Sequence, residues 1–110
     1  MADEPKYLLV LSTCPGSITA KQIANAVVAD NLAACVQTIP EVHSVFRWLN
    51  RTDAADEYLL LMKTTARRYQ DLERKIRSLH PYELPEIIAV PITAGFDQYL
   101  SWIDNSTQIE

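Results

Sequence analysis

The residues best suited to chemistry lie close together in the segment 78–86, Ser-Leu-His-Pro-Tyr-Glu-Leu-Pro-Glu. His80 and Glu86 supply an imidazole and a carboxylate, groups that bind metal ions or transfer protons. Pro81 and Pro85 stiffen the chain, because proline removes a backbone donor and disfavours the helical conformation in the residue before it. We therefore expect His80 to be extended, in a segment that is either a ligand-binding loop or a rigid connector between a helix and a strand.

A second candidate for chemistry is Cys14, which lies where an apolar, strand-like run ends and a helix-like segment begins. The positive end of a helix dipole lowers the pKa of a nearby thiol and makes it a better nucleophile or metal ligand. The alternative is a small residue that fills a turn. Cys35 lies in an apolar run and is expected to be a buried structural thiol, and His43 is expected to form a structural or interface hydrogen bond.

The composition narrows the classes of protein. The chain has 110 residues, 48% of them hydrophobic and 22% charged, as expected for one folded domain. Its net charge of −4 and the lack of a basic run argue against nucleic-acid binding. The two cysteines are too few for a disulfide scaffold, and no CxxC motif indicates structural zinc. No apolar stretch approaches the roughly 18 residues that span a bilayer, and the first six residues lack the apolar core of a signal peptide, so we expect a soluble cytoplasmic protein.

The first third of the chain predicts a strand and then a helix. The run 7–13 is nearly continuously apolar, which is typical of a central strand that is covered on both faces or flanked on both edges. Apolar residues at helical spacing follow it. Thr19 and Gln22 have the spacing of a capping box at the start of this helix, and Asn31 is a plausible end.

The middle of the chain predicts an unusually long β-hairpin. Strand-like residues span 32–49, turn residues follow at 50–53, and a second strand covers 57–64. Pro40 fits a bulge in the first strand. Typical strands have about 5–6 residues, so a hairpin of this length, with apolar residues near its tip, extends beyond the core of the domain. We therefore expect the hairpin, residues 32–64, to dock on other copies of the chain.

The last part of the chain predicts a helix over 66–80 after the N-cap Thr65, a strand over 86–92, and a final short helix that Asp97 caps. The complete order is β-α-β-β-α-β-α, which is the ferredoxin-like α+β pattern with an antiparallel sheet and an added C-terminal helix. We expect a single domain over 1–110, with loose tails at about 1–6 and 106–110. The fold hosts many functions and does not decide the activity.

Five short strings, taken in order, resemble the CutA divalent-cation-tolerance family, and the similarity runs from about Tyr7 to Asn105. The strings are Val10–Pro15, Asn31–Val36, Met62–Thr65, His80–Glu86 and Tyr99–Ile103. Each string has low specificity alone, but five in this order are highly specific. The resemblance implies a homotrimer of ferredoxin-like subunits, related in architecture to PII-type signalling proteins. It also implies a part in the tolerance of copper and other divalent metals.

The same resemblance locates a metal site. In copper-binding members, a cysteine occupies the position of Ser12 and a histidine that of Leu79. The two remaining ligands match His80 and Glu86. A weak hydroxyl ligand therefore replaces a thiolate, and Leu79 offers no ligand. Cys14 lies on the same side of an extended strand as Ser12 and about 7 Å further along. We expect weak binding of copper or another divalent cation through His80, Glu86 and Cys14.

Two other functions are consistent with the sequence. A PII-like trimer has clefts between subunits, and Lys63, Tyr82 and Trp102, together with Glu86, are candidate lining residues for a small ligand in a sensor or scaffold. An enzyme could use Lys63 and Glu86 as an acid–base pair. No nucleophile or cofactor motif accompanies this pair, so we expect an ion pair or a solvent-facing lysine, and no enzymatic activity.

Overall fold

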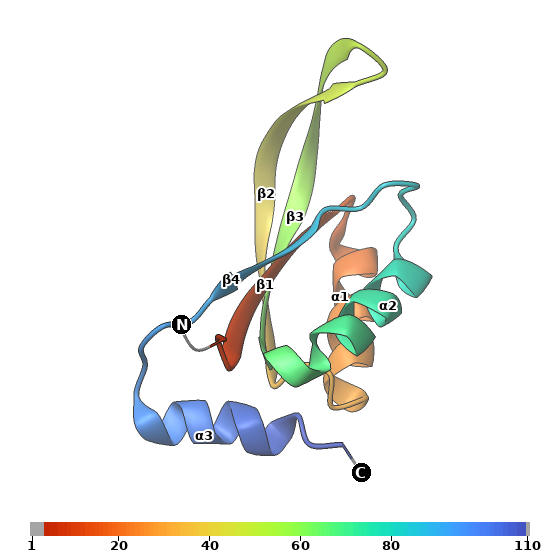
Figure 1. The fold of residues 1–110 in the computed structure, drawn as a ribbon. Helices are drawn as coiled ribbons and strands as arrows, with labels where there is room; N and C mark the ends of the chain where they lie inside the picture. The colour runs from red at the N-terminus through yellow and green to blue at the C-terminus, as the bar shows by residue number, and fades with distance from the viewer. Residues whose placement is uncertain (1–3, 110) are drawn as a thin grey trace.

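The computed structural model describes residues 4–109 of the chain (Figure 1). The elements are β1 (Tyr7–Cys14), α1 (Ser17–Ala29), β2 (Cys35–Trp48), β3 (Arg51–Thr65), the 3₁₀ turn η1 (Ala66–Arg68), α2 (Tyr69–Leu79), β4 (Ile87–Pro91) and α3 (Asp97–Ser106). Apart from the short turn η1, this is the predicted order β-α-β-β-α-β-α, which is therefore confirmed.

The strands described by the structure form one antiparallel sheet in the order β2-β3-β1-β4. β1 lies between β3 and β4, as its continuously apolar sequence predicts. β4 is an edge strand and ends at Pro91, where the missing N–H of proline is tolerated. The architecture is the α+β sheet-and-helix arrangement predicted from the sequence, with α3 added at the C-terminal end.

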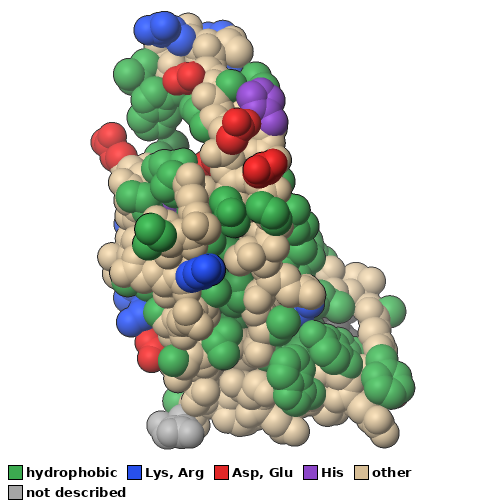
Figure 2. Space-filling model, turned by 180° about the vertical axis from the view of Figure 1, so that it is seen from behind, with side chains coloured by type: hydrophobic (Ala, Val, Ile, Leu, Met, Phe, Trp, Pro, Cys, Tyr) green, Lys and Arg blue, Asp and Glu red, His purple; other side chains and the backbone are tan. Residues whose placement is uncertain are grey.

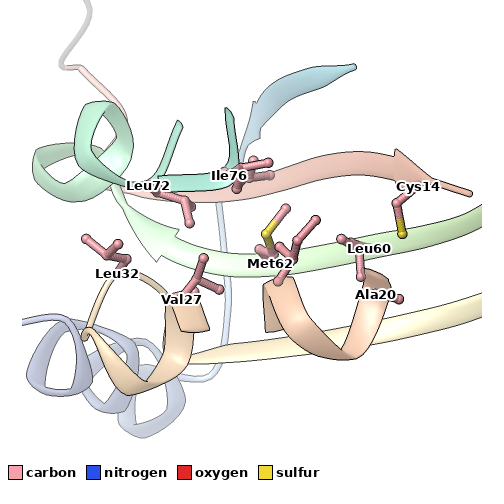
Figure 3. Packing of buried hydrophobic residues seen from close by; sticks show 11 residues of the cluster. Cys14, Ala20, Val27, Leu32, Leu60, Met62, Leu72 and Ile76 are labelled. Carbon is pink, nitrogen blue, oxygen red and sulfur yellow. The ribbon is translucent and has the colours of Figure 1, made fainter. Parts of the chain in front are cut away.

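Helices α1 and α2 pack side by side on one face of the sheet and close the core (Figures 1 and 3). Alternate strand residues point toward these helices, and Val10, Leu60 and Met62 are fully buried there. Leu72 and Ile76, one turn apart on α2, pack against the same cluster. The body of the molecule therefore has a complete hydrophobic core within one copy of the chain.

The β2–β3 hairpin extends well beyond this body (Figure 1), and the molecule measures 43 × 33 × 22 Å along its principal axes. The turn consists of Leu49 and Asn50, with φ angles of 51° and 62°. Positive φ at both positions matches the twist of a two-residue hairpin turn. The predicted turn at 50–53 is wrong, because residues 51–53 already pair with β2.

The bulge predicted at Pro40 is confirmed. The pairing between β2 and β3 shifts between Ile39 and Val42, and Glu41 has a positive φ of 61°. β2 is the other edge of the sheet, so a proline can lie in it without breaking the ladder to a second neighbour. The bulge gives β2 one more residue than the matching stretch of β3.

Of the two predicted helix N-caps, the capping box of α1 is wrong, whereas Thr65 is confirmed as an N-cap in position only. α1 begins at Ser17 after Gly16 and has no side-chain cap, so Thr19 and Gln22 lie inside the helix. Thr65 does precede the helical residues of η1, but its side chain caps no backbone N–H. Its hydroxyl instead lies 3.3 Å from another hydroxyl, that of Thr107, because α3 packs against the end of β3.

Other boundaries differ by a few residues. Asn31 has a φ of 59° just beyond α1, which confirms it as the helix end. β2 begins at Cys35, three residues later than predicted, because the backbone N–H groups of Leu32 and Ala33 bond back to Val27 of α1, and only from Ala34 onward does the chain bond to β3. Cys35 itself is half-buried, rather than fully buried as expected. The predicted helix over 66–80 divides into η1 and α2, and Asp97 is the first residue of α3 rather than its cap.

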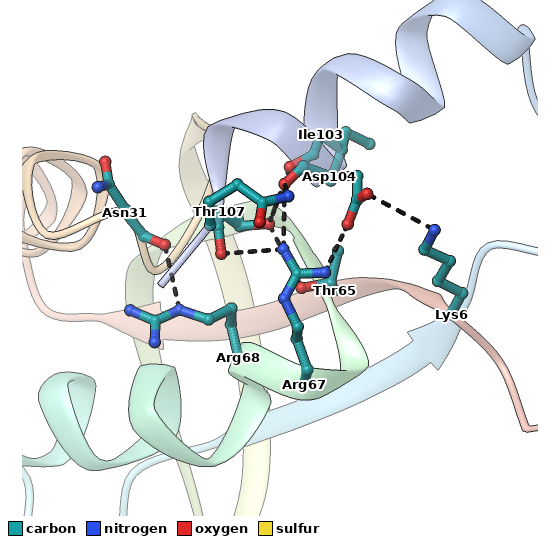
Figure 4. A network of polar contacts seen from close by, with 9 residues as sticks. Lys6, Asn31, Thr65, Arg67, Arg68, Ile103, Asp104 and Thr107 are labelled. Carbon is teal, nitrogen blue, oxygen red and sulfur yellow. Dashed lines mark hydrogen bonds and ion pairs between the residues drawn. The ribbon is translucent and has the colours of Figure 1, made fainter. Parts of the chain in front are cut away.

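The C-terminal segment is firmly attached to the body (Figure 4). Arg67 donates hydrogen bonds to the carboxylate of Asp104 and to the backbone carbonyl of Thr107, and Lys6 forms a second ion pair with Asp104. Thr107 is fully buried. The predicted loose tails are therefore wrong at residues 106–107 and at Lys6, whose backbone carbonyl accepts a hydrogen bond from the start of η1. Residues 1–3 and 110 lie outside the described residues.

Candidate ligand-binding groove

An open groove of about 810 Å³ lies between the hairpin and the loop that joins α2 to β4. The hairpin contributes Ser44, Val45, Phe46, Arg47, Trp48, Asp53 and Glu57, the loop contributes Pro81, Tyr82, Glu83, Leu84 and Glu86, and β1 contributes Thr13. Most of the segment that the sequence marks for chemistry therefore borders a concave surface, which makes this groove the candidate site.

His80, at the start of this loop, is held by hydrogen bonds at both ring nitrogens. Nε2 lies 2.7 Å from the carbonyl oxygen of Thr13, and the backbone N–H of Tyr82 donates to Nδ1 at 3.2 Å. Because a carbonyl oxygen only accepts, the ring proton is on Nε2. The backbone is extended, with φ −79° and ψ 135°, as predicted from the following proline. The imidazole thus ties the loop to β1, and it must release one of these bonds to bind a metal ion.

Tyr82 and Glu57 form a partly buried polar contact in the groove. The Tyr82 hydroxyl donates to Oε2 of Glu57 at 2.8 Å, and Glu57 is only 6% exposed. Burial, reinforced by the hydrogen bond to the Glu57 carboxylate and by its negative charge, raises the pKa of Tyr82 to about 12. The tyrosine therefore stays a hydrogen-bond donor at physiological pH.

Sequence reasoning missed Glu57 as a site residue. The available signal was a charged residue at the start of the apolar run Tyr58–Met62, which is unusual for a strand that enters a core. Its partner Tyr82 is 25 residues away in the sequence, and only the folded chain brings the two together.

Cys14 is the last residue of β1 and belongs to the hydrophobic core. Burial raises the pKa of its thiol, so the lowered pKa considered from the sequence is wrong and the small, space-filling alternative is favoured. Ser12, two residues earlier, is fully buried, and its Oγ has no hydrogen-bond partner within residues 4–109. Leu79 packs against the core from the end of α2.

The other three predicted site residues, Glu86, Lys63 and Trp102, do not form one cluster within a single chain. Glu86 is exposed at the rim of the groove. Lys63 donates to the side chain of Gln37 on the neighbouring strand and forms no ion pair with Glu86. Trp102 lies on α3, where its ring stacks on that of Tyr99 at 5.3 Å between centroids. Of the predicted cleft residues Lys63, Tyr82 and Trp102, only Tyr82 lines the groove.

The predicted metal ligands are not brought together as a set. Within residues 4–109, no group of three or more His, Cys, Asp or Glu side chains lies close enough to hold a metal ion. His80 and Cys14 are turned into the fold, whereas Glu86 faces solvent. Metal binding through His80, Glu86 and Cys14 therefore stays a prediction.

The comparison with protein families gives a direct match. Residues 8–106 match the family described as CutA1 divalent ion tolerance protein. The chain belongs to this family. The resemblance noted in the sequence is confirmed, and the family is one of divalent-cation tolerance proteins rather than of enzymes.

Individual relatives agree with this assignment. The divalent-cation tolerance protein CutA of Thermus thermophilus is 41% identical over 99 residues, which cover 90% of this chain and 96% of the relative. The chloroplastic protein CutA of Arabidopsis thaliana is 39% identical over 92% of this chain, but the match spans only 56% of that longer protein. Other family members thus carry additional sequence outside the matched region.

Solved structures match the fold closely. The CutA structure from Xylella fastidiosa has a TM-score of 0.91 at 37% identity, covering 94% of this chain and 99% of that one. The CutA1 structure from Shewanella sp. SIB1 has a TM-score of 0.92 at 39% identity, covering 96% and 98%. No helix among the described residues is long and apolar enough to cross a membrane.

Proposed function

We propose that the protein works in the tolerance of divalent cations as a cytoplasmic homotrimer that binds a divalent metal weakly. The observation that carries this proposal is the family match over residues 8–106. The trimer, the metal and the compartment are inferences about this chain, and each is open to a separate experiment.

The exposed apolar surface supports association of several copies. The hairpin tip is rich in apolar side chains, with Val45 64% and Leu49 78% exposed. Exposed Ile88 and Val90 of β4 pair with Leu11 and Leu9 of β1. Figure 2 shows hydrophobic side chains over much of the molecule seen from behind. Apolar surface of this extent marks an interaction site in a soluble protein. Sedimentation equilibrium tests this part, and a single-copy mass at micromolar concentration would contradict it.

The chemistry of the groove supports weak rather than tight metal binding. Glu86 supplies an accessible carboxylate at the rim, but His80 is engaged at both nitrogens and Cys14 is a buried thiol. A soft metal such as copper prefers thiolate and imidazole ligands. Copper binding therefore requires His80 to exchange its bond to Thr13 or Tyr82 for the metal, which opposes binding.

Calorimetric titration of Cu²⁺ tests the metal site with three proteins: wild type, His80→Ala and Glu86→Gln. We expect wild-type binding in the micromolar range or weaker, and a loss of affinity of about tenfold or more in each variant, the scale seen when a ligand-supporting group is removed. Glu73→Gln, a carboxylate change on α2 outside the groove, is the matched control. Identical isotherms for wild type and both site variants would refute the assignment of His80 and Glu86.

The compartment is tested by fractionation of cells that produce the untagged protein. Relatives differ in this respect, since the Arabidopsis protein is named chloroplastic and the Archaeoglobus fulgidus structure is described as periplasmic. We expect the protein in the soluble cytoplasmic fraction.

A second candidate function is a PII-like sensor of a small ligand or a protein-anchoring scaffold without metal. The observation that favours it is the groove of about 810 Å³, a size that suits small molecules. A thermal-shift screen with metabolites tests it, because a ligand at 100 times its Kd stabilises the native state by about 2.7 kcal/mol. A flat response across metabolite classes would argue against the sensor.

A further inference from the structure

The geometry points to the groove between the hairpin and the α2–β4 loop as a binding site for an organic cation, a protonated or quaternary amine that carries an apolar group. This inference goes beyond metal tolerance, and of the proposed metal ligands the groove contains only Glu86. Its centre is Glu57, which lies in the wall of the groove and is only 6% exposed.

Among residues 4–109, the charge of Glu57 has no counter-ion. Its one hydrogen bond within residues 4–109 comes from the neutral hydroxyl of Tyr82, and no ion pair among these residues includes it. A buried carboxylate is unfavourable unless a positive charge or several donors compensate it. A cation in the groove would supply that charge.

The other charges of the groove have the same sign. Asp53, Glu83 and Glu86 add carboxylates to its lining, against the single guanidinium of Arg47. The excess of negative charge selects a cation over an anionic metabolite.

The walls of the groove favour an organic cation over a bare metal ion. The rings of Phe46, Trp48 and Tyr82 line it, and aromatic faces attract ammonium groups but offer no oxygen ligand to a divalent ion. No three acidic, His or Cys side chains of the described chain converge to replace a hydration shell. Val45 and Leu84 add apolar surface for a hydrocarbon group, so the ligand combines a positive head with an apolar part.

The experiment uses the full-length protein in its own oligomeric state, with the Trp102→Phe change so that Trp48 is the remaining tryptophan. Benzyltrimethylammonium chloride is titrated while the fluorescence of Trp48 is followed, and benzyl alcohol serves as the neutral probe. We expect a saturable change with the ammonium probe and none with the alcohol at equal concentrations.

Two variants test the negative charge of Glu57 and the aromatic ring of Phe46. Glu57→Gln keeps an acceptor for Tyr82 but removes the charge, and we expect it to weaken binding at least about tenfold, as for loss of a charged partner. Phe46→Leu keeps apolar bulk and should weaken binding about threefold, the scale of one cation–π contact. Glu73→Gln removes the carboxylate of another tyrosine–glutamate pair, Tyr69–Glu73, and should leave binding unchanged. Thermal unfolding shows whether each variant is folded.

The outcomes separate clearly. Equal responses to the ammonium and the alcohol, or equal binding by wild type and Glu57→Gln, overturn the proposal. An unresponsive Trp48 in the assembled protein also overturns it, because a second copy then fills the groove. If Glu57→Gln does not fold, the affinity of Phe46→Leu for the ammonium probe and the response to benzyl alcohol still test the proposal. Loss of copper binding in His80→Ala with retained ammonium binding would leave this inference and the metal proposal independent of each other.

Discussion

The body of the molecule and its hairpin use similar apolar residues but leave them in opposite environments. In the body, Leu60, Met62, Leu72 and Ile76 are fully buried between the sheet and two helices. In the outer hairpin, large apolar side chains such as Leu49 stay exposed, because no helix covers two strands that leave the body. A two-stranded hairpin alone is marginally stable in water. The difference shows that the body has its own hydrophobic core within one chain, whereas the apolar side chains of the outer hairpin have no such cover among residues 4–109.

The largest effect that tests this comparison is expected in the core. Leu72→Ala should lower the free energy of unfolding by about 2–5 kcal/mol, because it leaves a cavity where α2 meets the sheet. Leu49→Ala, measured at a protein concentration low enough for single copies, should change it by less than about 0.5 kcal/mol. Urea unfolding followed by circular dichroism measures both. Equal losses of unfolding free energy in the two variants would mean that the hairpin tip and the core are similar environments.

The next effect concerns association. Val45→Lys combined with Leu49→Lys places two charges on the exposed hairpin tip. We expect the mass in sedimentation equilibrium to fall from three copies to one, since like charges then meet at the proposed interface. The far-ultraviolet circular dichroism should be unchanged. Ile18→Lys together with Ile109→Lys, two exposed apolar positions away from the hairpin, is the matched control and should leave the mass as it is. If the mass of the hairpin variant still corresponds to three copies, the interface lies elsewhere.

A smaller effect is expected where the C-terminal segment joins the body. The hydrogen bond from Arg67, with the positive charges of Arg67 and Lys6, holds the pKa of Asp104 below its ordinary value. A lowered pKa means that the folded state is stabilised above the pKa of unfolded aspartate and loses this contribution as the pH falls through the folded pKa.

Asp104→Asn should therefore cost about 1–2 kcal/mol at pH 7, the scale of a charged hydrogen bond, and less below pH 4. Urea unfolding across this pH range measures the change. Asp71→Asn is the control, because the Asp71 side chain is 47% exposed against 24% for Asp104 and its partners Arg68 and Arg74 are local i,i+3 neighbours; such pairs contribute about 0.5 kcal/mol or less. A pH-independent loss in Asp104→Asn would contradict the electrostatic origin.

The smallest effect is expected at the groove in alkaline solution. The pKa of Tyr82 is raised to about 12, so this contact stabilises the fold fully below about pH 10 and loses its contribution as the pH rises through 12. The absorbance at 295 nm of wild type minus Tyr82→Phe isolates the titration of this hydroxyl. In Glu57→Gln the pKa should move back toward the ordinary value of tyrosine. An unchanged titration curve would show that Glu57 does not act on Tyr82.

Local signals in the sequence predicted most of the fold. The order of the elements, the central position of β1, the bulge at Pro40 and the extended backbone of His80 follow from apolar patterns and from proline geometry. The position of the hairpin turn did not, because a leucine with positive φ is uncommon and gives no turn signal.

The sequence predicted only part of the candidate site. The loop of His80 and Glu86 stands out by composition, but the pair Tyr82–Glu57 depends on the path of the chain over the end of β1. The pKa direction expected for Cys14 was wrong for a related reason, since burial by α1 and the sheet outweighs the local effect of a helix start. Residue types name candidates, whereas tertiary packing decides which of them face a ligand.

The bulge at the base of the hairpin has a consequence for ligand preference. With one extra residue in β2, the pairs change from Ile39 with Leu59 to Val42 with Glu57, so even-numbered residues of the outer strand share the side of Glu57. This places Phe46 rather than Arg47 on that side. If the pairing of Ile39 with Leu59 continued without the bulge, Glu41 would stand opposite Glu57, and Arg47 would take the side that Phe46 now occupies. The extra residue therefore decides that the aromatic side chains of β2 share a face of the hairpin with the Glu57 carboxylate.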